Sequence, residues 1–190
     1  MLSVIVATHE SERTLVPTLS ALVPGAMSGL VTEVVVADAG STDATAEVAD
    51  IAGCRFMIAE GDAGSRLRDA ALTTRTPWLM FMRAGLVPEP GWMAAAESFI
   101  QAAAFGENSP RAAIFRATSD QASPGLRELL AVLQAMFGGG DRSAQGLLIA
   151  RSLYDAIGGH PAGAGAEAAI LRKIGRRRLA LLGASARTVA

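Results

Sequence analysis

The chain has 190 residues, which suits a single domain over 1–190 with enough residues to bury a sizeable core. Its 51% hydrophobic and 18% charged residues exclude a disordered protein, and its net charge of −1 excludes an overall positive field that would attract nucleic acid. The single cysteine excludes an internal disulfide and a cysteine-rich zinc site.

Strand-like and helix-like segments alternate through the first half of the chain. Short apolar runs predict two buried strands over Leu2–Ala7 and Glu33–Ala37, a third, shorter strand over Arg55–Ala59, and a fourth, the most apolar, over Pro77–Met82. Apolar residues at helical spacing predict intervening helices, one through Leu15 and Leu22 that ends at Pro24-Gly25, one near Thr45, and one over Gly64–Thr74. Such βα units predict an α/β fold, a mostly parallel sheet flanked by helices on both faces.

The second half is less regular. Its pattern predicts a helix over 90–105, a loop over 106–110, a strand over 112–117, a helix from Leu126 to Phe137, a hinge at Gly138–Gly140, a strand over 145–150, helices over 151–157 and 164–174, and a polar tail. No targeting segment and no apolar run of membrane-spanning length is visible, so we expect a cytoplasmic protein without a transmembrane segment.

Open parallel sheets bind ligands at the carboxyl ends of their strands, which directs attention to Thr8–Ser11, Asp38–Asp43, Ala59–Arg68 and Arg83–Pro88. Within the second of these, Asp38 follows a buried strand and precedes a glycine turn. Its carboxylate is suited to accept hydrogen bonds from a ribose or a base. The same segment is also typical of a plain strand-to-helix turn with Asp43 in the first helical turn, and the pattern leaves both interpretations open.

The order of these segments resembles the family 2 glycosyltransferases of the GT-A fold. Ser3–Glu10 followed by Val34–Thr45 is similar to the family's opening strand and its Asp-Asp-Gly-Ser-Thr-Asp segment. Later matches cover nearly the whole chain, at Leu67–Ala70, Trp78–Met82, Pro88–Trp92 and Leu148–Pro161. The resemblance implies a nucleotide-sugar-binding domain. It places Thr8, His9 and Glu10 in the nucleotide site, with Asp38 holding the base.

The resemblance also suggests which residues bind the diphosphate and which carry the reaction. Arg66 or Arg68 would reach the diphosphate, although either arginine also fits a solvated helix face. Glu167 is the candidate base that deprotonates the acceptor, with Asp141 in reserve. A helix-start glutamate accounts for Glu167 equally well. His160, after the Gly-Gly turn, is expected on the surface.

The chain departs from the family where a metal is usually held. The family's Asp-x-Asp, which holds Mg²⁺ or Mn²⁺, is replaced by Arg83-Ala84-Gly85, so no metal site is predicted and no cofactor is certain. Either Arg83 supplies the positive charge that the metal would have supplied, or the site has decayed.

We therefore expect sugar transfer from a nucleotide-diphosphate sugar to an unknown acceptor, saccharide or lipid-linked, without a metal. The alternative is a non-catalytic nucleotide-binding or scaffolding relative; a nucleotidyltransferase lacks its basic glycine-rich signature here. The run Arg176–Arg178 is usually a solvated face but weakly favours association with an anionic membrane surface. A homodimer stays open.

Overall fold

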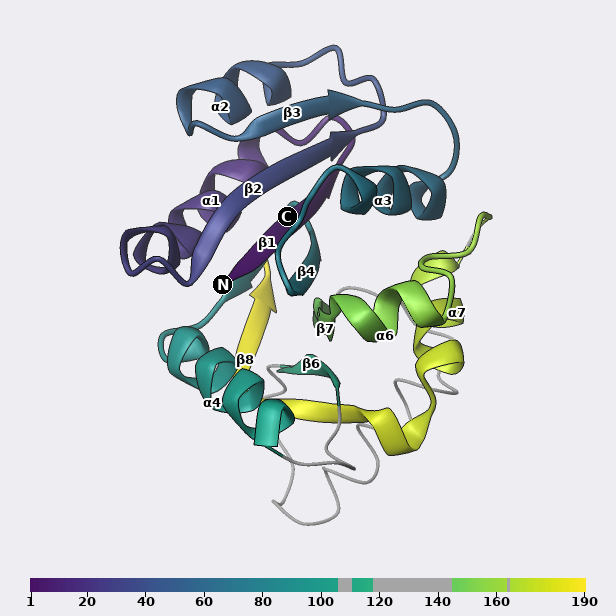
Figure 1. Cartoon of the computed structure of the whole chain (residues 1–190). Helices are drawn as coiled ribbons and strands as arrows, with labels where there is room; N and C mark the ends of the chain where they lie inside the picture. Colours follow the sequence, from purple (N-terminus) through teal and green to yellow (C-terminus); the bar gives the residue numbers. More distant parts are fainter. Residues whose placement is uncertain (106–110, 118–144, 164) are drawn as a thin grey trace.

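The computed structural model describes residues 1–105, 111–117, 145–163 and 165–190. Within these residues one sheet holds eight strands in the order β3-β2-β1-β4-β7-β6-β8-β5. Figure 1 shows β1, β2, β3 and β4 in the upper part of the view and β6, β7 and β8 below them. The strands are β1 (Leu2–Thr8), β2 (Val31–Asp38), β3 (Arg55–Ile58), β4 (Trp78–Arg83), β5 (Leu86–Pro88), β6 (Ala112–Ala117), β7 (Leu147–Ala150) and β8 (Leu179–Thr188). The predicted helix at 126–137, the hinge at 138–140 and the loop at 106–110 lie outside the described residues.

The first half of the sheet is parallel, as predicted. β1 pairs with β2 on one side and with β4 on the other, and β3 pairs with β2, all in parallel. The β-branched and apolar runs of β1, β4 and the second half of β2 are buried on both faces, which is why they show no polar alternation, whereas β3 at the edge of the sheet is partly exposed. The carboxyl ends of β1 and β2 therefore lie at one edge of the sheet, with Thr8 opposite Asp38 in register.

The second half mixes strand directions. β7 runs antiparallel to β4 and β6, β8 runs parallel to β6, and the short β5 closes the edge against β8. The prediction of a polar tail is wrong, because the chain from Leu179 to Thr188 is a strand. Its buried positions include Leu182, Ala184 and Ala186, so it does alternate. Alanine, serine and glycine have low strand propensity and hide that alternation in the sequence.

Helices cover both faces of the sheet, as predicted. On one face α1 (Glu12–Met27), α2 (Thr45–Ile51) and α4 (Trp92–Phe105) share a core with Val4 and Met80. On the other face α3 (Ala63–Leu72), α6 (Arg151–Ala156) and α7 (Ala166–Ile174) share a core with Ile5 and Phe81. The candidate site described below lies on this second face and along the carboxyl-end edge.

The predicted stop of α1 at Pro24-Gly25 is wrong, because the helix continues to Met27. Trp92 packs on Gly25 so closely that a Cβ there would lie 2.9 Å from the indole ring. The indole Nε1 donates to the Ala21 carbonyl oxygen (3.1 Å), which ties α4 to this turn of α1. The helix ends instead before Gly29, whose positive φ of 78° suits a helix terminus. Tertiary packing thus overrides the local proline signal.

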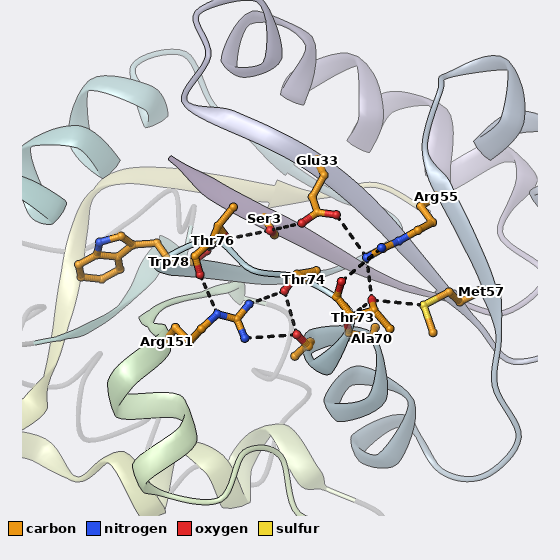
Figure 2. A network of polar contacts seen from close by, with 11 residues as sticks. Ser3, Glu33, Arg55, Met57, Ala70, Thr73, Thr74, Thr76, Trp78 and Arg151 are labelled. Atoms are coloured by element: carbon orange, nitrogen blue, oxygen red, sulfur yellow. Dashed lines mark hydrogen bonds and ion pairs between the residues drawn. The ribbon is translucent and has the colours of Figure 1, made fainter.

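A polar network closes the amino-end side of the strands (Figure 2). Arg151, the first residue of α6, donates from Nε to the Thr76 carbonyl oxygen (2.7 Å) and from Nη1 to the Ala71 carbonyl oxygen (3.3 Å). Ser3 joins the network by donating to Glu33 (2.7 Å) and lies 2.7 Å from the Thr76 hydroxyl. These side chains satisfy one another, which leaves the opposite edge as the place for a ligand.

Candidate functional site

The loops after β1 and β2 are bonded into one unit, which we call the β1–β2 platform (residues 8–12 and 38–45). The Thr8 hydroxyl donates to Asp38 Oδ2 (2.6 Å), and the Ala39 N–H donates to the Thr8 carbonyl oxygen (3.1 Å). The Glu10 N–H donates to Ser41 Oγ (2.8 Å), while the Glu10 carboxylate accepts from the Thr42 N–H (2.8 Å). The structure thus brings together Thr8, Glu10 and Asp38.

Asp38 organises the platform from inside. Its side chain is fully buried, Oδ1 accepts from the N–H groups of Gly40 (2.8 Å) and Ser41 (2.6 Å), and Oδ2 accepts from the hydroxyls of Thr8 and Ser41 (both 2.6 Å). Burial acts to raise the pKa of Asp38, but these hydrogen bonds outweigh it and leave the pKa below its usual value. The described contacts of this carboxylate are therefore those of a turn, and a contact with a base stays a proposal.

The platform also fixes the starts of α1 and α2. A carboxylate at the start of each helix accepts a hydrogen bond from a backbone N–H at the start of the other. Asp43 accepts from the Glu12 N–H at the start of α1 (3.0 Å), and Glu12 accepts from the Ala44 N–H before α2 (3.2 Å). His9 is exposed at this edge, and Glu10 has a positive φ of 48°, a conformation that only glycines share among the described residues. Backbone strain of this kind collects at functional loops.

Arg66 lies near the start of α3, the helix that follows β3. Its Nη1 donates to the Gly61 carbonyl oxygen (2.6 Å), and its Nε is buried without a hydrogen-bond partner among the described residues. Arg68, two residues further along α3, is half-exposed, and its Nε lies 3.9 Å from Asp69 Oδ1. A buried guanidinium N–H without an acceptor is costly, so the Nε of Arg66 is an unfavourable feature of the described structure.

The start of α3 is fixed against the turn that follows α6. The Gly163 N–H is the main cause that lowers the pKa of Asp62 to about 2, and the Ser65 N–H, which donates at 3.1 Å, adds to it. Gly64 lies so close to this turn that a Cβ would come within 2.0 Å of the Pro161 carbonyl oxygen. These contacts hold the start of α3 against the turn that follows α6.

Arg83 ends β4, at the position where the sequence analysis expects the acidic residues of the related family. It pairs with Ala7 in register, and strand alternation places it on the same face as Phe81. The next turn is held by Gly85, whose N–H donates to Thr18 Oγ1 (2.9 Å) and whose carbonyl oxygen accepts from the Val189 N–H (2.8 Å).

This end of β4 does not fit a hard metal ion. Arg83 is itself a cation, and Ala84 and Gly85 have no side-chain oxygen to offer. Across the described part of the chain, no three His, Cys, Asp or Glu side chains are grouped closely enough to hold a metal.

A small pocket lies on the same face of the sheet as Arg83. Phe81, Leu147 and Ile114 form its floor, at one level across β4, β7 and β6. Its cavity of about 20 Å³ is lined by Phe81, Ile114, Gln145, Gly146, Leu147, His160, Glu167, Ile170 and Leu171. Glu167, at the start of α7, therefore lies on the same side of the sheet as Arg83. The reserve base, Asp141, falls outside the described residues.

His160 is not on the surface, and that expectation is wrong. Its residue is 1% exposed, and its ring meets Phe81 edge to face with centroids 4.5 Å apart. Nδ1 lies 3.0 Å from the Tyr154 hydroxyl, which also accepts from the His160 N–H (3.2 Å). Burial lowers the pKa of His160 to about 4, so the imidazole is neutral at physiological pH. Gly159 permits this arrangement, because a Cβ there would lie 3.1 Å from the Tyr154 ring.

Comparison with known proteins identifies the family of the chain. Residues 3–115, more than half of the chain, match the family model described as glycosyl transferase family 2. No curated protein matches the chain. No helix in the described ranges is long and apolar enough to cross a membrane.

Solved structures share the fold at low sequence identity. Glucosyl-3-phosphoglycerate synthase from Mycobacterium tuberculosis, in complex with Mn²⁺, uridine-diphosphate and glucosyl-3-phosphoglycerate, is 20% identical with a TM-score of 0.70, and the match covers 100% of this chain and 72% of that one. S. aureus TarS in complex with UDP-GlcNAc is 16% identical with a TM-score of 0.71, and the match covers 100% of this chain and 59% of that one.

Proposed function

The chain belongs to glycosyl transferase family 2, and on that premise we propose that it transfers a sugar from a nucleotide-diphosphate sugar to an acceptor hydroxyl without a bound metal. The observation that carries this proposal is the placement of Arg83 and Glu167 on one side of the sheet, beside the carboxyl-end edge. A cation that could stabilise the leaving group and a carboxylate that could act on the acceptor then lie on the same face.

The donor would lie over the β1–β2 platform. Thr8 and His9 would lie beside the base, Glu10 and Asp38 would keep the loop in shape or contact the base, and Arg66 and Arg68 would bind the diphosphate. The partial exposure of both arginines on α3 supports this assignment, because a guanidinium pairs well with phosphate oxygens. The uridine nucleotides in the two structural relatives make uridine-diphosphate the first nucleotide to test.

The reaction would use two side chains directly. Glu167 would accept the proton of the acceptor hydroxyl as its oxygen forms a bond to the sugar. The bond between the sugar and the diphosphate would break, and its electron pair would stay on the diphosphate. Arg83 would stabilise that negative charge, because a fixed guanidinium next to a developing anion favours the transition state. In one structural relative Mn²⁺ is bound with uridine-diphosphate, whereas here the end of β4 offers a guanidinium.

Arg83→Ala tests this function, with Arg75→Ala as the matched control. Arg75 is exposed and precedes β4 at the opposite end of the strand. We expect Arg83→Ala to lower sugar transfer by about 100-fold or more while the melting temperature stays near that of the wild type. The control should transfer at the wild-type rate. Transfer by Arg83→Ala at the wild-type rate would contradict the role of Arg83, and binding of nucleotide without turnover by the wild-type chain would favour the non-catalytic relative.

Association with a membrane surface, cellular location and oligomeric state are further proposals. Arg176, Arg177 and Arg178 are all exposed on one 3-10 turn, which supports a weak association with an anionic membrane surface. A cytoplasmic location and a homodimer remain predictions.

A further inference from the structure

The turn that follows Arg83 is held by a threonine of α1. Thr18 is fully buried, and its hydroxyl donates to the Thr14 carbonyl oxygen one turn earlier in the helix (3.1 Å). The hydroxyl proton is thereby used, which leaves the oxygen available as an acceptor. It accepts from the Gly85 N–H (2.9 Å), two residues after Arg83. Thr18 therefore links α1 to the chain that leaves β4.

The other side of this turn is fixed by backbone contacts. Gly85 has a φ of 90°, and a Cβ there would lie 2.7 Å from the Val189 carbonyl oxygen. The Gly85 carbonyl oxygen accepts from the Val189 N–H (2.8 Å), and the Ala84 N–H donates to the Ala7 carbonyl oxygen at the end of β1 (3.0 Å). Among the described residues, Thr18 is the one whose side chain hydrogen-bonds to the backbone of Ala84 or Gly85.

The proposed reaction needs this turn to be fixed. A metal ion is placed by several ligands at once, whereas an arginine side chain is long and turns about several bonds. A guanidinium stabilises a developing anion best when its position is set before the reaction, so that nothing has to reorganise as the charge forms. The backbone that carries the arginine is the part that the fold can set, and supporting hydrogen bonds are the usual means of setting it.

We propose that Thr18 is a positioning residue for Arg83: its hydroxyl fixes the turn after β4, and this holds the Arg83 guanidinium where it binds the diphosphate of the nucleotide. The inference rests on the proposed function and extends its site to α1. Thr18 itself touches no ligand, because α1 covers the face of the sheet opposite to that of the Arg83 side chain. Its effect on the diphosphate should therefore pass through Arg83.

The test compares the affinity for a nucleoside diphosphate, the tightest ligand of a calorimetric panel, with that for the monophosphate of the same nucleoside. The ratio of the two affinities measures what the terminal phosphate contributes. Thr18→Val removes the hydroxyl but keeps the branched shape, while the Gly85 N–H keeps the Thr14 carbonyl oxygen as an acceptor (3.1 Å). We expect the ratio to fall by about 3- to 10-fold, the usual effect of one hydrogen bond. Thr18→Ser retains the hydroxyl and should restore the ratio.

Ser20→Ala is the matched control. Ser20 lies on the exposed side of α1, away from the sheet, and its hydroxyl makes the same kind of helix contact by donating to the Val16 carbonyl oxygen (2.8 Å). This variant should keep the wild-type ratio. Melting temperatures are recorded for all variants, and Thr18→Ala takes the place of Thr18→Val if the valine variant does not fold.

A double-mutant cycle separates this inference from the proposed function. Arg83→Ala should lower the same ratio by about tenfold, and adding Thr18→Val to it should change the ratio by less than twofold, because the group through which Thr18 acts is already gone. A further fall in the double variant, or a lowered ratio in Arg83→Ala beside an unchanged one in Thr18→Val, overturns this inference alone. An unchanged ratio in Arg83→Ala overturns the role of Arg83 and this inference with it. If no nucleoside diphosphate binds, the proposed function and this inference are both overturned.

Discussion

Replacing Asp38 by alanine should unfold the β1–β2 platform rather than remove a single ligand contact. The carboxylate is fully buried and accepts four hydrogen bonds, two from backbone N–H groups and two from hydroxyls. The hydroxyls of Thr8 and Ser41 can turn to other partners, but the N–H groups of Gly40 and Ser41 cannot. Each lost bond to a charged acceptor is worth about 1.5–3 kcal/mol, so we expect a loss of about 3–5 kcal/mol in the free energy of unfolding.

Denaturant and thermal unfolding measure this loss. For a chain of this length, each kcal/mol corresponds to about 2–4 °C, so the melting temperature of Asp38→Ala should fall by about 6–20 °C. Asp38→Asn is the matched control, because it keeps Oδ1 as an acceptor for both N–H groups, and it should cost less than half as much. An Asp38→Ala protein that melts within 2 °C of the wild type would refute the reasoning. If Asp38→Asn folds but loses uridine-diphosphate affinity by tenfold or more, Asp38 also contacts the base.

Three further predictions concern the rest of the site. Gly64→Ala should lower the free energy of unfolding by about 2 kcal/mol, because its methyl group would lie 2.0 Å from the Pro161 carbonyl oxygen. Gly183→Ala, whose methyl would meet only Ala95 at 3.7 Å, should be neutral or slightly stabilising, and equal losses in denaturant unfolding would contradict the packing. The pKa of His160 is about 4 when folded and about 6.5 when unfolded, so the unfolded chain binds more protons between these values. Stability should therefore fall by about 3 kcal/mol as the pH drops from 6.5 to 4, and an equal fall in His160→Gln would contradict this account. A chelator should leave uridine-diphosphate affinity unchanged in calorimetry, and affinity that requires Mn²⁺ would contradict the role of Arg83.

The parallel half of the fold could be predicted because its signals are local. The apolar runs of β1, β2 and β4 and the helical spacing of α3 need no knowledge of distant residues. By contrast, α1 passes through Pro24 because Trp92, nearly seventy residues later, packs on Gly25. β8 was missed because small residues carry its alternation, and its pairing with β6 and β5 is made only in the folded chain.

In the candidate site, too, some features follow from the local sequence and others depend on residues that are distant in the chain. Thr8 and Asp38 end adjacent parallel strands, so the sequence predicted their proximity, and the hydrogen bond between them follows. How completely Asp38 is engaged by Ser41 and Gly40 depends on the exact path of the turn, which the sequence does not specify. The burial of His160 depends on Tyr154 and Phe81, which come from α6 and β4, and no local pattern indicated it.

Calorimetric titration with a panel of nucleoside diphosphates, with and without Mn²⁺, tests the central claim most directly. The account predicts saturable binding of at least one nucleoside diphosphate, uridine-diphosphate first, with the same affinity in Mn²⁺ and in chelator. It also predicts that Arg66→Ala weakens this binding by about tenfold, since a guanidinium bonded to a phosphate oxygen is lost. Absence of binding for every nucleoside diphosphate, with or without Mn²⁺, would contradict a nucleotide-sugar transferase.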